Sequence, residues 1–164
     1  MIIDSHQHFW NYDPIRDIWI DNSMAVLKRN FLPKDLKKIY KINSVDGCVA
    51  VQADQSEEET IFLLDQASKN NFIKGVVGWL DIKSSKLNDL LSYYTKYPVF
   101  KGLRHIVQNE KDINFMLKSD FQRGLSCLEE YNLTYDILIK EHQMDQAIKM
   151  VKKNPNQIFI LDHI

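Results

Sequence analysis

The chain has 164 residues, of which 45% are hydrophobic, and its formal net charge at pH 7 is -1. This length and hydrophobic content suit one domain with a sizeable core and argue against several domains. Because the charge is nearly balanced and no long run of Lys or Arg occurs, nucleic acid and anionic membranes are not expected partners, and a small molecule is.

The first apolar stretch, Ile2 to Asp4, is predicted to be a strand that runs into His6 and His8. Side chains of an extended strand alternate between its faces, so this spacing puts both imidazoles on the same side. Histidine is the commonest metal ligand and the usual acid–base side chain. A structural, hydrogen-bonded histidine pair explains the spacing equally well, and the pair alone leaves both interpretations open.

The segment from Asn11 to Phe31 has no clear periodicity. A connection of this length is either a lid over the histidine pair or an ordinary packed excursion. Pro33 then suits the first turn of a helix. The apolar positions of that helix predict that it buries Leu36, Ile39 and Tyr40.

Five further runs rich in Val and Ile are predicted strands, and several are continuous rather than alternating, as in strands buried on both faces. They are Val45 to Gln52, Ile73 to Leu80, Val99 to Ile106, Thr134 to Ile139 and Ile158 to His163. Between them, Ser56 and Glu59 have the spacing of a capping box at a helix start. The apolar stripes predicted to face the core are Thr60, Leu63, Leu64 and Ala67; Leu87, Leu90, Leu91 and Tyr94; and Met144, Ala147, Ile148 and Val151.

Strands that alternate with helices predict an α/β protein with parallel pairing and right-handed crossovers. Since the six predicted strands start about every 31 residues, eight such units would need ~250 residues, the usual size of a (β/α)₈ barrel. Residues 1–164 are therefore expected to form either one partial barrel domain of about six units, with the C-terminal units missing, or an open sheet of six strands.

Polar residues follow every predicted strand, at the edge where parallel α/β sheets place their sites. Asp54 and Asp81 are more simply interpreted as loop or helix caps. Arg104 continues a core strand, where an unpaired charge would be costly, so anion or substrate binding is favoured for it. His163 is either a core imidazole or a third histidine that converges with the first two.

Five motifs together resemble those of the amidohydrolase-related family, and the sugar lactonases of the fuconolactonase and rhamnonolactonase type are the nearest branch. They occur in the family's order and span nearly the whole chain. The motifs are Asp4-Ser5-His6-Gln7-His8-Phe9-Trp10, Val51-Gln52-Ala53-Asp54, Gly78-Trp79-Leu80-Asp81, Lys101-Gly102-Leu103-Arg104-His105 and Leu161-Asp162-His163. The resemblance implies a distorted (β/α)₈ TIM barrel and a hydrolase that opens a lactone to a hydroxy acid.

Carried over to matching positions, the resemblance implies that His6, His8 and His163 line the site. They would either hold Zn²⁺ or another divalent metal, or polarise the lactone carbonyl directly. Arg104 would orient a substrate oxygen or carboxylate, since its guanidinium is a planar fork of donors. The substrate-binding residues expected beside these catalytic ones are Trp10, Gln52, Trp79 and His105.

The wider superfamily commonly activates the attacking water with an Asp after the eighth strand, and residues 1–164 contain no such position. The leading hypothesis is nevertheless a lactonase-like hydrolase of aldonolactones. A metal-dependent amidohydrolase or decarboxylase on the same barrel is the second. A noncatalytic truncated barrel is the third, and its exposed strand edges would invite a partner chain, including a second copy in a homo-oligomer.

The N-terminus lacks a basic region followed by an apolar one, and no apolar run approaches the ~20 residues of a membrane-spanning helix. Cys48 and Cys127 lie far apart in apolar surroundings and belong to no metal-type or redox-type spacing. A cytoplasmic protein with reduced thiols is therefore expected.

Overall fold

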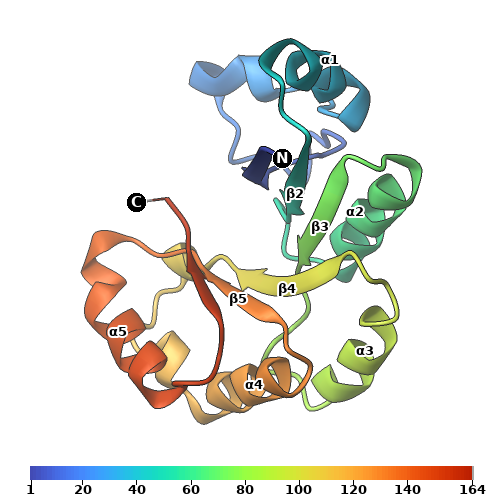
Figure 1. The fold of residues 1–164 in the computed structure, drawn as a ribbon. Helices are drawn as coiled ribbons and strands as arrows, with labels where there is room; N and C mark the ends of the chain where they lie inside the picture. The colour runs from blue at the N-terminus through green and yellow to red at the C-terminus, as the bar shows by residue number, and fades with distance from the viewer. Residues whose placement is uncertain (164) are drawn as a thin grey trace.

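A computed structural model of the protein describes residues 1–163 (Figure 1). Its strands are β1 (Ile3–Gln7), β2 (Gly47–Val51), β3 (Ile73–Gly78), β4 (Phe100–His105), β5 (Thr134–Ile137) and β6 (Phe159–Leu161). They form one sheet in the order β1-β2-β3-β4-β5-β6, and every neighbouring pair is parallel. The six strands predicted from the Val- and Ile-rich runs are thus confirmed.

The helices connect these strands and lie on the outer side of the curled sheet (Figure 1). They are α1 (Pro33–Asn43), α2 (Glu57–Lys69), α3 (Leu87–Tyr94), α4 (Ser119–Glu130) and α5 (Met144–Lys153). Short 3₁₀ helices complete the connections: η1 (Asn22–Leu27), η2 (Val107–Asn109), η3 (Phe115–Leu117) and η4 (Glu141–Gln143).

The strand order decides between the two expected architectures. A doubly wound open sheet reverses its order at a switch point, whereas a (β/α)₈ barrel adds each strand beside the previous one. Here the order follows the chain without reversal and the sheet curls. The protein is therefore an α/β half-barrel that corresponds to six units of an incomplete TIM barrel.

Two local signals fix the starts of α1 and α2. Pro33 occupies the first turn of α1, and the Asp35 carboxylate accepts the Leu32 N–H at 3.0 Å. At α2, the Ser56 hydroxyl accepts the Glu59 N–H at 3.2 Å, as predicted. The reciprocal half of the capping box does not form, because the Glu59 carboxylate accepts the Ala53 N–H at 3.1 Å instead.

The core lies between the sheet and its helices. Leu63 of α2, Leu91 of α3 and Leu125 of α4 are completely buried against it. Each such leucine contributes about 2 kcal/mol of burial free energy. This layer holds the strands in place, so the side chains at their carboxyl ends have fixed positions.

Two predicted helix faces need correction. Ile39 of α1 is 54% exposed, whereas Tyr40 is buried and Leu36 is partly buried. On α5 the buried residues are Ala147 and Met150, so the predicted stripe is wrong at three of its four positions. Only the side of α5 that carries these two residues is buried, and its remaining apolar residues are exposed: Met144, Ile148 and Val151.

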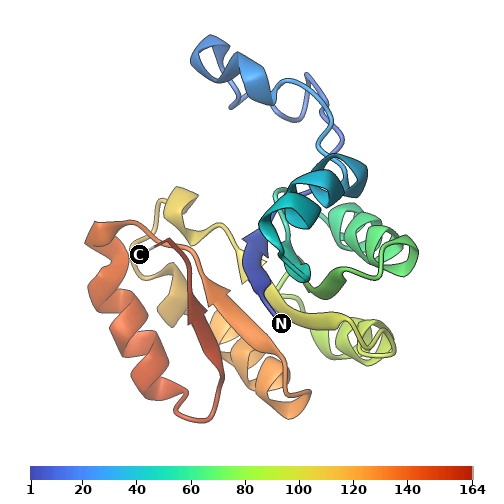
Figure 2. The same cartoon turned by 45° about the horizontal axis from the view of Figure 1, so that its top comes forward.

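The segment between β1 and α1 projects from the body of the molecule, as Figure 2 shows. Paired backbone hydrogen bonds between Trp10 and Phe31, both 3.0 Å long, close its base. Asp17 and Ile20 are buried, whereas Ile15 is 84% exposed. Within residues 1–163 no helix has both the length and the apolar character needed to cross a membrane.

Candidate active site

The two histidines at the end of β1 lie side by side. Their Nε2 atoms are 3.2 Å apart, and their rings meet edge to face with centroids 4.8 Å apart. The strand spacing predicted this shared side. Nδ1 of His8 lies 2.8 Å from the Val51 carbonyl oxygen. Because a carbonyl only accepts, Nδ1 carries the proton and a neutral His8 presents an unprotonated Nε2.

Arg104, near the end of β4, lies beside this pair and is 3% exposed. Its Nη1 donates to Oδ2 of Asp162 at 3.0 Å and lies 3.3 Å from Nε2 of His6. Its Nη2 donates to the Gln52 carbonyl. Partners from β1 and from the residues that follow β2 and β6 thus fix the guanidinium, which a buried charge requires.

Asp162 links the arginine to the histidine pair. Its Oδ1 lies 3.4 Å from Nδ1 of His6, and its other oxygen accepts from Arg104. Burial by itself would raise the pKa of the Asp162 carboxyl, but the hydrogen bonds from His6 and Arg104 hold that pKa below its usual value. Asp162 is therefore an ionised acceptor for both neighbours.

Burial, and after it the positive charge of Arg104, lowers the pKa of His8 to about 4. His8 is consequently neutral at pH 7 and can accept a hydrogen bond. The ring of His163 lies 5.1 Å from that of His6, and its backbone is left-handed at φ 54°. The structure thus brings together all four predicted catalytic residues.

A cavity of about 560 Å³ opens beside these groups. His8, Arg104 and His163 contribute to its wall, whereas His6 lies behind His8. The other lining residues come from the projecting segment, the β2–α2 loop, the first turn of α2 and the segments after β4 and β5: Trp10, Arg16, Asp17, Trp19, Ile20, Leu27, Ala53, Asp54, Glu59, Ile106, Gln108, Asn109 and Leu138. Its volume is that of a small-molecule site.

Of the four predicted substrate-binding residues, only Trp10 lines this cavity. Gln52 is fully buried behind Arg104, and its Nε2 donates to the Arg104 carbonyl oxygen at 3.2 Å. Trp79 donates from Nε1 to Nδ1 of His105 at 3.3 Å, and Nε2 of His105 lies 2.7 Å from Glu110. These three residues support the site's walls from outside the cavity.

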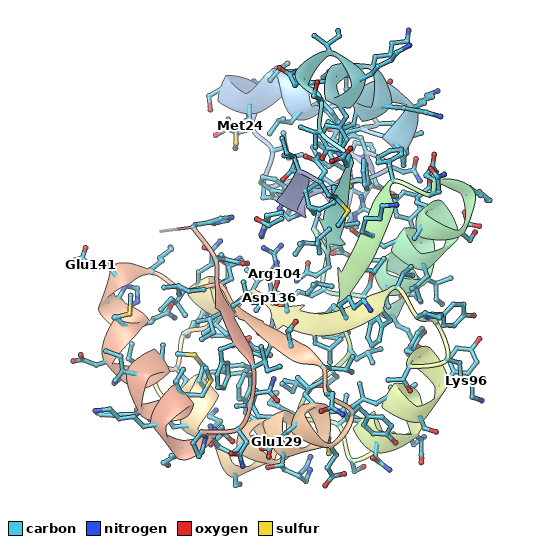
Figure 3. The ribbon with its side chains drawn as sticks, in the orientation of Figure 1. Met24, Lys96, Arg104, Glu129, Asp136 and Glu141 are labelled. Carbon is cyan, nitrogen blue, oxygen red and sulfur yellow. The ribbon has the colours of Figure 1, made fainter. Side chains whose placement is uncertain are left out.

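Asp136 of β5 is a further polar residue at this site, and no sequence motif marks it. Asp136 is the register partner of Arg104, and Figure 3 shows their side chains at the inner side of the curled sheet. Asp136 is 3% exposed and accepts from the Thr134 hydroxyl at 3.2 Å. Burial, followed by the charge of Asp162, raises the pKa of Asp136 to about 7. Thr134 and Asp136 are two residues apart in one strand, so their side chains face the same side. This alternation is the sequence signal that points to Asp136.

Glu59, Arg16 and Asp17 also line the cavity, although no sequence motif marks them as site residues. The spacing of Glu59 from Ser56 predicts only half of a capping box. Arg16 and Asp17 form an ion pair at 2.8 Å within a segment that lacks periodicity, so no sequence pattern marked them. The cavity lining shows that this segment forms one wall of the candidate site.

The histidine pair has part of the geometry of a metal site. Two nitrogens that bind one Zn²⁺ at tetrahedral angles lie about 3.3 Å apart, close to the 3.2 Å between the two Nε2 atoms. However, Nη1 of Arg104 lies 3.3 Å from Nε2 of His6, where its positive charge opposes a cation. Within residues 1–163 no group of three or more His, Cys, Asp or Glu side chains is placed to hold a metal ion. These residues alone do not fit a resident metal, and metal dependence stays a prediction.

Comparison with known proteins identifies the family of the chain. A family model described as amidohydrolase matches residues 3–164. An L-fucono-1,5-lactonase of Burkholderia multivorans is 34% identical over 162 residues, which are 98% of this chain and 54% of that protein. An L-fucono-1,5-lactonase of Burkholderia ambifaria is 27% identical over 161 residues, which are 98% of this chain and 56% of that protein. The chain thus spans about half the length of the curated relatives it matches.

A similar solved structure is that of an amidohydrolase from Burkholderia multivorans with bound zinc. It superposes with a TM-score of 0.95 at 34% identity, and the match covers 99% of this chain and 57% of that one. The half-barrel described above is therefore the arrangement of a known enzyme fold.

Proposed function

The chain belongs to the amidohydrolase family, and from that premise we propose that it carries active-site residues of a hydrolase that opens a sugar-derived lactone to its hydroxy acid. The fuconolactonase relatives support a sugar lactone as the substrate class. The observation that carries the proposal is Arg104: a buried guanidinium, fixed by Asp162 at 3.0 Å, in the wall of the cavity that His8 also lines.

In the proposed reaction the lactone carbonyl lies against Arg104, which donates hydrogen bonds to the oxygen as negative charge develops there. Asp162 keeps the guanidinium in place, so little reorganisation is needed when water adds to the carbonyl. His8 is neutral at pH 7 because its pKa is about 4, and its unprotonated Nε2 orients the attacking water.

The proton that the water loses passes to Nε2 of His8, the histidine nitrogen that orients this water in the cavity wall. Asp162 orients the neighbouring His6 through Nδ1 at 3.4 Å. Nε2 of His8 returns the proton to the ring oxygen as the ring C–O bond breaks. The product is the open hydroxy acid.

A pH-stat assay with a panel of aldono-1,5-lactones and aldono-1,4-lactones tests the proposal. We expect Arg104→Ala to lower kcat/KM by about 10²–10³-fold, the cost of one oxyanion donor. Arg104→Lys keeps the charge next to Asp162 but loses the fork of donors, so it should also be impaired while remaining folded.

Arg123→Ala is the matched control, because Arg123 is an exposed arginine on α4 that donates to the Lys83 carbonyl. It should leave kcat/KM unchanged. Absence of ring opening across the whole panel, or wild-type activity in both Arg104 variants, would refute the proposed function.

A further inference from the structure

Glu59 is a buried carboxyl group in the wall of the cavity that the reaction proposed above does not use. It is 6% exposed, although it belongs to the first turn of α2, where a glutamate ordinarily faces water. Its Oε1 accepts the Ala53 N–H at 3.1 Å. Among the described residues, no hydrogen bond or ion pair within 4.0 Å reaches its other oxygen. This second oxygen keeps some solvent access, so a ligand in the cavity can reach it and donate to it.

The neighbouring cation does not compensate for this. Arg16 donates from Nε and Nη2 to the two oxygens of Asp17, both at 2.8 Å, and from Nη2 to the Asn11 carbonyl at 2.6 Å. Its guanidinium is thus held by Asp17 and acts on Glu59 only over distance. Burial consequently raises the pKa of Glu59, and the Ala53 N–H and Arg16 only partly oppose this.

Asp54 lies next to Glu59 in the same wall, and one of its oxygens accepts the Ser56 hydroxyl at 2.7 Å. The same cavity is lined by His8, Arg104 and His163. Trp10 provides an apolar ring surface in the same cavity. The cavity therefore combines acceptors without donors, a cationic group and a flat apolar wall, which are the features that bind a polyhydroxylated ring.

We propose that Glu59 forms a second subsite of this cavity, in which its free carboxylate oxygen accepts hydrogen bonds from ring hydroxyl groups of the substrate. This inference rests on the proposed function and sharpens it: the site selects hydroxylated sugar lactones over lactones with a bare hydrocarbon ring. A site built to bind a hydroxyl group discriminates strongly against an analogue that lacks it, because the buried acceptor is then left unpaired.

The test compares Glu59→Gln with wild type on two substrates of the same ring size, an aldono-1,5-lactone that the wild type opens and δ-valerolactone, which has no hydroxyl groups. Glutamine keeps an acceptor for the Ala53 N–H but removes the carboxylate. We expect kcat/KM for the aldonolactone to fall roughly 10²-fold while that for δ-valerolactone stays the same or rises. Glu58→Gln, on the exposed side of the same helix turn, should change neither value.

A binding experiment keeps this inference separate from the proposed chemistry. The probe is 1,5-anhydrogalactitol, a hydroxylated ring with no carbonyl to attack, measured by calorimetric titration. Binding should weaken at least tenfold in Glu59→Gln and not in Glu58→Gln. Equal loss of activity on both lactones, or equal binding of the probe by wild type and Glu59→Gln, would overturn the subsite. A wild type that binds the probe through Glu59 but opens no lactone would retain the subsite and refute only the proposed reaction.

Discussion

The stability of the folded protein depends on whether Asp136 is protonated. Its pKa in the folded protein is about 7, whereas the usual value is 3.8. The folded state therefore binds this proton more tightly than the unfolded chain does. The resulting stabilisation is fully present below pH 3.8, and it is lost as the pH rises through 7.

We predict that Asp136→Asn removes this loss of stability at high pH. At pH 8 the variant should be more stable than wild type by as much as ~4 kcal/mol, since one unit of pKa shift corresponds to about 1.4 kcal/mol. The advantage should shrink towards pH 4. Urea denaturation at the two pH values measures it, and Asp145→Asn, an exposed carboxyl group on α5, is the control. A variant less stable than wild type at pH 8 would contradict the pKa of Asp136.

At the level of single residues, the sequence indicated which strand ends carry the site but not which contacts form there. His6 and His8 were found because alternation along one strand is a local rule. The pairing of Arg104 with Asp162 spans 58 residues, and no local rule predicts it. Gln52, Trp79 and His105 sit at strand ends as expected, yet they face neighbours rather than the cavity, because packing fixed their rotamers.

Among the parts of the chain, the projecting segment is the one whose structure the sequence predicted least. It lacks periodicity because it is held by specific polar contacts and not by a continuous apolar face. Asp17 provides several of these contacts: it accepts from Arg16, and its Oδ2 accepts the Asp13 N–H at 2.9 Å. The cavity wall formed by Trp19 and Ile20 depends on this arrangement.

We predict that Asp17→Asn loosens the segment without unfolding the barrel. The amides of Asp13 and of residues 15–20 should exchange with deuterium roughly tenfold faster, the factor that corresponds to about 1.4 kcal/mol. Exchange in β2 and β3 should stay unchanged. Asp89→Asn, an exposed carboxyl group on α3, is the comparison variant. Unaltered exchange in residues 13–20 would show that Asp17 does not hold the segment.

The helices illustrate the limit of periodicity. The stripe of α3 was predicted correctly, since Leu87, Leu91 and Tyr94 are buried and Leu90 is partly buried against the core. The apolar residues of α5 share one broad side of the helix, so periodicity alone does not show which edge of that side is buried. Tertiary packing buries the edge that carries Ala147 and Met150.

At the scale of the whole molecule, the two outer strands of the sheet are the places where another chain can pair. Within residues 1–163, β1 and β6 each have one strand neighbour. The β6 side exposes large apolar side chains, with Ile158 at 57%, Ile160 at 46% and Leu161 at 42%. An apolar strand edge is a template for pairing with another chain.

We predict that the purified 164-residue polypeptide self-associates at concentrations on the order of 10 to 100 µM. Ile160→Lys should shift the population towards monomer, because a charge on an edge strand opposes pairing. Ile61→Lys, on the exposed side of α2, should not. Sedimentation velocity measures the distribution, and a single 19.3 kDa species at every concentration would contradict the prediction.

The sequential strand order also bears on how the chain acquires its structure. Because each strand pairs with the one synthesised before it, every new strand–helix unit meets an edge that already exists. Pairing of β1 with β2 joins Ile3 to Gly47, so a sheet can begin to form before the later strands are synthesised. Growth from the N-terminus then needs no rearrangement of earlier pairs. The half-barrel is thus an architecture that can assemble vectorially, in step with translation.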